Sequence, residues 1–130
     1  MPKLTTFLMF EGRADEAVTF YMSLFDDSKI ESIVRYDAMK PALDGKVMHM
    51  RFTLAGQEFM ALDSDVHHNF SFTPAMSIFV TCDDEAQLSD LFSKLSENGE
   101  IRMPLDNYGF SQKFGWTDDR FGVSWQLNLQ

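Results

Sequence analysis

In the first half of the chain the spacing of apolar positions is first that of a strand, then that of a helix, and then that of three further strands. The expected elements are a strand at 4–10, a helix at 15–25 with acidic residues in its first turn, and strands at 30–36, 47–54 and 58–63. Ala55-Gly56 between the last two is typical of a short hairpin connection. The pattern therefore predicts a βαβββ module over about residues 3–64.

The second half repeats this order. Expected here are a strand at 75–82, a helix at 84–96, and strands at 101–105, 111–117 and 123–129. Asp84 with Gln87 fits a capping box, and Asn98-Gly99 ends the helix with the glycine in the left-handed position. These elements predict a second module over about residues 74–130.

A shift of 71 residues aligns the two halves without a gap through their first strand and helix. It places Phe7 on Ile78, Ala17 on Leu88, Tyr21 on Phe92 and Leu24 on Leu95. Chance aligns one helical stripe more readily than a strand, a connection and a stripe together. We therefore expect an α+β fold of two βαβββ modules within a single domain, residues 1–130, the alternative being an α+β sandwich without a repeat.

Composition limits the function classes. The chain has 130 residues, 45% of them hydrophobic, enough for a sizeable core. Its net charge of -9 disfavours nucleic acid as a partner. A single cysteine, Cys82, together with the lack of an apolar leader or a run long enough to span a membrane, predicts a cytoplasmic protein without a membrane partner.

Four stretches carry a family resemblance: GQEFMALD at 56–63, FSFTPA at 70–75, KLSENGE at 94–100 and GWTDDRFGVSWQ at 115–126, the last being the most specific. They resemble the PhnB-like branch of the vicinal oxygen chelate superfamily, which includes glyoxalase I, extradiol dioxygenases and bleomycin-resistance proteins. The resemblance implies a glyoxalase/bleomycin-resistance-like fold, with mixed sheets curled into a cup, and often a homodimer. Members often carry the name 3-demethylubiquinone-9 3-methyltransferase.

The residues do not provide what a doubly wound S-adenosylmethionine-binding domain needs. Such a domain has a glycine-rich turn between its first strand and helix, so that the backbone can approach the ligand. The corresponding segment here, Phe10-Glu11-Gly12-Arg13, has one glycine. The sequence therefore does not predict methyl transfer.

Superfamily enzymes hold a divalent metal with ligands from the first and fourth strands of each module. Carried over by the resemblance, those positions are Thr6, Ala61, Ser77 and Gln126. A catalytic divalent site needs about three histidine, carboxylate or thiolate ligands, and this set has none. We therefore expect no metal and no other cofactor.

Strand alternation predicts which side chains line the cup. Its expected members are Thr6, Leu8, Phe10, Phe59, Ala61, Ser77, Phe79, Ser124 and Gln126. An aromatic surface with a few small polar groups suits a small organic ligand held by a few hydrogen bonds. The main hypothesis is therefore a metal-free small-molecule binding protein. The alternative is a structural dimer whose aromatic side chains fill the cup.

A second hypothesis is an enzyme that uses acid–base chemistry. His49 could serve as a general base, and Arg51 on the same strand face could hold a carboxylate or phosphate. Asp63 on the next strand is the candidate partner of His49. The alternative for His49 and Arg51 is an outward polar face or a dimer contact. The nearby Asp65, His67 and His68 are expected in a solvated loop, where a metal would bind only at the surface.

The remaining candidates are assigned lesser roles. Carboxylates beside Cys82 disfavour a nucleophilic thiolate. Trp116 and Trp125 are expected to seal a module core or a dimer interface. The rim candidates are Arg102, Tyr108 and Lys113. Thirteen Phe and nine Met are many for 130 residues to hide, which also favours a homodimer.

Overall fold

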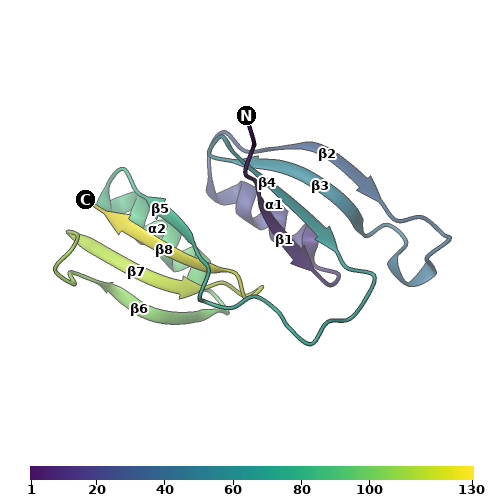
Figure 1. Ribbon diagram of the computed structural model, residues 1–130. Coiled ribbons are helices and arrows are strands. Elements are labelled where there is room, and N and C mark those ends of the chain that lie inside the picture. Colours follow the sequence, from purple (N-terminus) through teal and green to yellow (C-terminus); the bar gives the residue numbers. More distant parts are fainter. The chain divides into compact units, whose positions relative to one another are not determined.

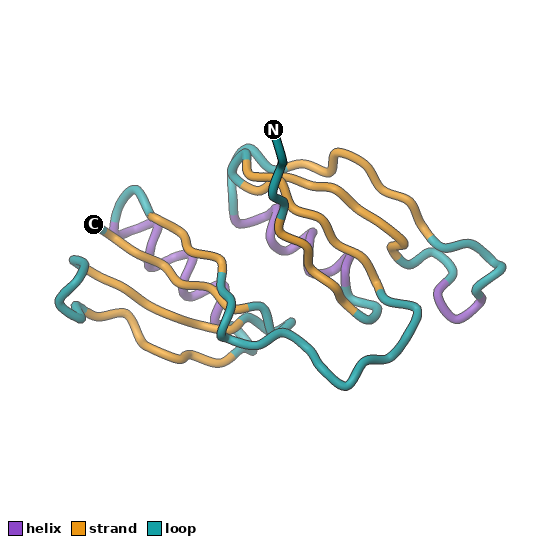
Figure 2. Tube along the Cα trace, viewed as in Figure 1, coloured by secondary structure: helices purple, strands orange, loops and turns teal.

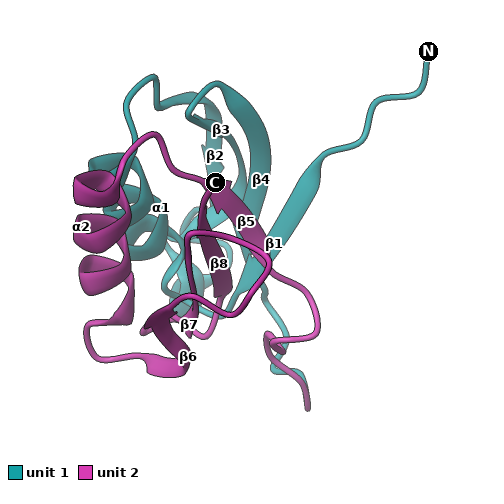
Figure 3. Ribbon diagram, turned by 90° about the vertical axis from the view of Figure 1, so that its left-hand side faces the viewer, with its two compact units in different colours: residues 1–68 teal, residues 69–130 magenta.

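The computed structural model describes residues 1–130, which divide into two compact units, residues 1–68 (unit 1) and 69–130 (unit 2), coloured separately in Figure 3. Unit 1 contains β1 (Thr6–Phe10), α1 (Ala14–Leu24), β2 (Lys29–Arg35), the short 3-10 helix η1 (Pro41–Leu43), β3 (Val47–Leu54) and β4 (Gln57–Asp63). Unit 2 contains β5 (Ile78–Thr81), α2 (Glu85–Ser96), β6 (Glu100–Asp106), β7 (Lys113–Asp118) and β8 (Ser124–Leu129). Figures 1 and 2 show this order of elements.

The two units have the same topology. The sheet of unit 1 has the strand order β1-β4-β3-β2, and that of unit 2 has the order β5-β8-β7-β6. In each sheet the first strand runs parallel to the fourth, and all other neighbours are antiparallel. Each helix lies against one face of its own sheet (Figure 3). The predicted α+β fold of two βαβββ modules is therefore confirmed.

The core of unit 1 lies between α1 and one face of its sheet. The helix buries one stripe, Ala14, Ala17, Val18 and Tyr21, as the 3.6-residue period requires. Phe52 of β3 and Phe59 of β4 stack beneath it with ring centroids 5.5 Å apart. The predicted hairpin between these strands is confirmed: Ala55 and Gly56 both have positive φ, as a tight two-residue connection requires.

The core of unit 2 repeats this packing. Helix α2 buries Leu88, Leu91, Phe92 and Leu95. Asp84 caps its first turn by accepting a hydrogen bond from the Gln87 amide at 2.8 Å, as the sequence predicted. At the other end the prediction was wrong by one residue, because Asn98 takes the left-handed conformation. Gly99 is required for a different reason: a Cβ there would clash with the backbone carbonyl of Asp118.

The repeat is regular in its helices but not in its first strands. Ala17 and Leu88 are both fully buried, as the shift of 71 expects. The same shift pairs Phe7, which is 47% exposed, with Ile78, which is half-buried and pairs with the core residue Trp125. The strand faces are therefore offset by one residue relative to the helices. Neither helix is long and apolar enough to cross a membrane.

Candidate functional site

The face of unit 2 that carries no helix is identified from β7. Gly115 lies against the Phe92 ring of α2, so close that a Cβ would sit 2.5 Å from it, and Thr117 Oγ1 accepts a hydrogen bond from Ser96 Oγ at 2.9 Å. The alternate residues therefore point to the opposite face, and strand register extends that face to β8 and β5. This helix-free face of unit 2 consists of Phe114, Trp116, Asp118, Ser124, Gln126, Asn128, Phe79, Thr81 and the preceding Ser77.

Two side-chain hydrogen bonds order the polar groups of this face. Gln126 Nε2 donates to Ser77 Oγ, and Trp116 Nε1 donates to Ser124 Oγ, both at 2.8 Å. Phe79 pairs with Gln126 in register and is 56% exposed. Gln126 Oε1 accepts no hydrogen bond and the Ser77 hydroxyl donates none. Unused polar atoms therefore lie beside an exposed aromatic ring.

One end of this face carries an ion pair. Arg102 donates from Nε and Nη2 to Asp118 Oδ2 at 2.9 and 2.7 Å, and these hydrogen bonds raise the pKa of the guanidinium. Asp118 Oδ1 is buried without a hydrogen-bond partner. The predicted rim residue Arg102 is therefore engaged by a carboxylate of its own unit.

The other end of the helix-free face of unit 2 is aromatic. Phe114 is buried, and the rings of Phe79, Tyr108 and Phe110 surround it at centroid distances of 6.5, 6.1 and 4.9 Å. Phe110 is 64% exposed. The predicted rim residue Lys113 pairs with Glu85 of α2 at 2.9 Å. The exposed apolar surface of this face therefore extends from β5 to the loop before β7.

The unit 1 members of the expected cup lie on the helix-covered face instead. Phe59 and Ala61 alternate in β4 with the same phase as Asp63, whose carboxylate contacts the start of α1. Register places Leu8 and Phe10 of β1 beside Ala61 and Asp63. Leu8, Phe10, Phe59 and Ala61 are 0–6% exposed, so they form core, and Thr6 is the exposed first residue on the same side of β1. The helix-free face of unit 1 therefore consists of their neighbours Phe7, Met9, Met60 and Leu62 with His49, Arg51 and Thr53 of β3.

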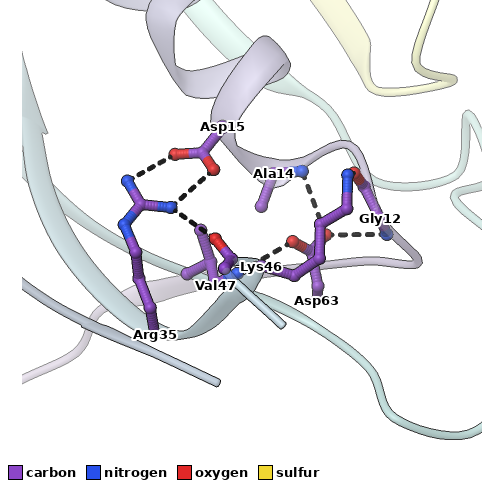
Figure 4. Close-up of polar contacts among 8 residues, drawn as sticks. Gly12, Ala14, Asp15, Arg35, Lys46, Val47 and Asp63 are labelled. Carbon is purple, nitrogen blue, oxygen red and sulfur yellow. Dashed lines mark hydrogen bonds and ion pairs between the residues drawn. The ribbon is translucent and has the colours of Figure 1, made fainter. Parts of the chain in front are cut away.

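Asp63 has a structural role that Figure 4 shows. Its Oδ1 accepts hydrogen bonds from the amides of Gly12 and Ala14 at 2.8 and 3.0 Å, and its Oδ2 accepts one from the amide of Val47 at 3.1 Å. The residue at the N-cap of α1, Arg13, makes no side-chain cap hydrogen bond. Asp63 therefore supplies the missing acceptor and places a negative charge at the positive end of the helix.

This placement separates the predicted acid–base pair. His49 lies on the helix-free face of unit 1, because the next residue, Met50, is fully buried and pairs with Ala61. Asp63 is fully buried on the other face of the same sheet. The structure therefore does not bring His49 and Asp63 together, and the imidazole has no hydrogen-bond partner.

The positions carried over as metal ligands are divided between the two units. Ser77 and Gln126 bond to each other in unit 2, and Thr6 and Ala61 lie in unit 1. No group of three or more histidine, cysteine, aspartate or glutamate side chains in the structure could hold a metal ion. In the connecting loop, His67 contacts Glu11, His68 contacts Ser64, and Asp65 pairs with Lys40.

Two further candidates have core roles. Burial raises the pKa of the Cys82 thiol to about 11, so the thiolate nucleophile is not populated at neutral pH. Trp125 is 1% exposed and donates from its indole to Asp119 Oδ2 at 2.9 Å. Trp116, in contrast, is half-buried on the helix-free face of unit 2. Of the two tryptophans, only Trp116 is placed to contact a ligand at that face.

Comparison with known proteins decides the family. The sequence model of the 3-demethylubiquinone-9 3-methyltransferase family matches residues 2–128. The chain belongs to this family. It is 59% identical to the PhnB protein from Bacillus cereus, whose structure superposes with a TM-score of 0.95 over 99% of this chain and 100% of that one. It is also 24% identical to Protein YjdN of Escherichia coli (strain K12), covering 97% of this chain and 94% of that protein.

This chain also has the glyoxalase-like fold that was expected from the resemblance. The fosfomycin resistance protein FosX from Listeria monocytogenes superposes with a TM-score of 0.66 at 10% identity, over 100% of this chain and 93% of that one, and at this identity the likeness concerns the fold alone. Neither sheet of the PhnB-like chain is a doubly wound parallel sheet. The chain therefore does not have the doubly wound fold that binds S-adenosylmethionine at a glycine-rich turn.

Proposed function

We propose that this PhnB-like protein binds a small organic ligand at the helix-free face of unit 2, and that it does so without a metal. The ligand has a planar ring with oxygen atoms attached to it. The observation that carries the proposal is the Gln126–Ser77 pair, whose unused polar atoms lie beside the exposed Phe79 ring. An apolar surface with a few placed polar groups is typical of sites for organic ligands. The ring would stack on Phe79, and its oxygens would accept hydrogen bonds from Ser77 Oγ and Gln126 Nε2.

The first probe follows from the family description, which names a demethylubiquinone as its substrate. We choose 2,3-dimethoxy-5-methyl-1,4-benzoquinone, the ubiquinone ring without its tail, because it is planar and carries four oxygen acceptors. The test is isothermal titration calorimetry on wild type and on Phe79→Ala. Loss of one exposed stacking partner should weaken binding by about 5- to 10-fold, from the about 1 kcal/mol that aromatic pairs contribute.

Ile101→Ala is the matched control. Ile101 is 50% exposed in unit 2, close to the 56% of Phe79, but pairs with Thr117 and so belongs to the helix-covered side. The control should bind the quinone like wild type. Equal losses in the two variants, or no binding at millimolar quinone, would contradict the proposal.

We also propose that the protein is a homodimer. Large hydrophobic side chains are exposed on β2, the edge strand of the unit 1 sheet, among them Val34 at 53% and Ile30 at 41%. Apolar side chains exposed on an edge strand favour an interface with a second copy of the chain. Sedimentation equilibrium at micromolar concentration should give twice 15.0 kDa, and a single 15.0 kDa species would refute this proposal.

A further inference from the structure

The helix-free face of unit 1 carries a cationic side chain with N–H donors that make no hydrogen bond, although the chain is acidic overall. Glu58 is bonded by two cations: Lys3 Nζ contacts Oε2, and Arg51 Nε donates to Oε1 at 3.0 Å. Glu58 is therefore shared by two positive charges, and Glu31 is a further carboxylate near Arg51. Arg51 Nη1 and Nη2 donate no hydrogen bond. The end of the guanidinium fork is thus available to an oxyanion, which it can bind with two parallel hydrogen bonds.

His49 adds a second unused donor on the same face. It lies two residues before Arg51 in β3, so both side chains point away from α1. The imidazole is half-buried and makes no hydrogen bond. A half-buried polar group without a partner has lost part of its hydration without replacement, and a ligand oxygen at this position would restore it.

Apolar side chains surround these two donors. Register places Met60 of β4 beside Arg51, and Phe7 of β1 beside Met60. Met9 and Leu62 form the next row toward His49. Phe7 is 47% exposed. The face therefore combines an adaptable apolar surface of methionine and aromatic side chains with unsatisfied N–H donors.

We propose that this face is a second ligand site, which binds an amphipathic organic acid: its oxyanion at Arg51 and His49, its apolar body on Phe7, Met9 and Met60. The charge match gives the orientation, since Arg51 can bond both oxygens of a carboxylate or sulfonate while Glu58 holds its Nε. The surrounding methionines tolerate apolar bodies of different shapes. All residues of this site belong to unit 1, whereas all residues of the proposed quinone site belong to unit 2.

The test uses a pair of fluorescent probes that differ in charge. 1-Anilinonaphthalene-8-sulfonate carries the sulfonate, and N-phenyl-1-naphthylamine has the same rings without it. Arg51→Gln should weaken binding of the sulfonate about tenfold and change binding of the neutral probe less than twofold, since a charge-assisted pair contributes about a factor of ten or more. His49→Phe should also weaken binding of the sulfonate selectively.

Arg13→Gln is the control, because it also removes one exposed arginine of unit 1. Arg13 lies at the start of α1, where it pairs with Glu16 at 2.8 Å, and not on the helix-free face. This variant should leave both probes unaffected, and circular dichroism should show all variants folded. Unchanged sulfonate binding in Arg51→Gln, or equal losses for the two probes, would overturn the proposal. Loss of the sulfonate in Phe79→Ala but not in Arg51→Gln would assign the probe to unit 2, which overturns this inference and leaves the quinone proposal standing.

Discussion

Replacement of Asp63 by asparagine tests how unit 1 is held together. The carboxylate is fully buried and accepts three backbone hydrogen bonds, from Gly12, Ala14 and Val47. In Asp63→Asn the side-chain NH2 group faces at least one of these N–H donors, which leaves a buried donor unpaired at a cost of about 1–3 kcal/mol. The remaining bonds lose charge assistance, about 1 kcal/mol each. The free energy of unfolding should therefore fall by about 3–5 kcal/mol.

The assay is urea unfolding followed by far-UV circular dichroism, with amide hydrogen exchange of α1 as a local readout. Exchange of the α1 amides should accelerate, because Asp63 caps the start of that helix. Asp26→Asn is the control: Asp26 is exposed in the same unit and its carboxylate makes no hydrogen bond or ion pair, so the stability of this variant should stay within about 0.5 kcal/mol of wild type. A loss below about 1 kcal/mol in Asp63→Asn would refute the assigned role.

Three further predictions concern unit 2. Gly99→Ala should destabilise by about 1–3 kcal/mol in urea unfolding, because its Cβ would clash with the Asp118 carbonyl; a neutral result would contradict the packing. Asp119→Ala should cost about 2–4 kcal/mol, since its carboxylate accepts from two amides and the Trp125 indole. Because the folded-state pKa of Cys82 is raised to about 11, stability from the buried neutral thiol is complete below about pH 9 and lost as pH rises toward 11. Alkaline unfolding curves of Cys82→Ala should lack this loss, and identical pH profiles would count against it.

The order of elements was predictable because the apolar period changes clearly between helix and strand. The two βαβββ modules, the hairpin at Ala55-Gly56 and the Asp84 cap were all expected from the sequence and are present. Each depends on local signals: period, turn chemistry and a capping side chain. Tertiary packing did not override them.

The faces of the unit 1 strands were not predictable in the same way. In β1 both alternating sets are apolar, Phe7 with Met9 and Leu8 with Phe10, so alternation alone does not say which set the helix covers. In β8 the alternate residues are polar, and there the expected face was found, with Gln126 opposite to Trp125. One signal in unit 1 could have identified the helix-covered face. Asp63 is the one acid that follows the apolar alternate residues Phe59 and Ala61 in β4, and a carboxylate is buried only where hydrogen-bond donors, here backbone amides, contact it.

Trp116 was expected to seal a module core or a dimer interface, and it does not belong to the core, because it lies half-buried on the helix-free face of unit 2. The signal that distinguishes it from Trp125 was the alternation of β7, in which Gly115 and Thr117 face α2. The sequence did not show this, because neither residue is strongly apolar.

The two tryptophans provide the most direct test of ligand binding at the helix-free face of unit 2. Each indole N–H gives its own signal in a ¹⁵N–¹H correlation spectrum: Trp116 Nε1 donates to Ser124 on the helix-free face, and Trp125 Nε1 donates to Asp119 in the core. Titration with 2,3-dimethoxy-5-methyl-1,4-benzoquinone should shift the Trp116 indole and the Gln126 side-chain amide signals and leave the Trp125 indole in place. Shifts confined to other residues, or equal shifts of both indoles, would contradict the proposed site.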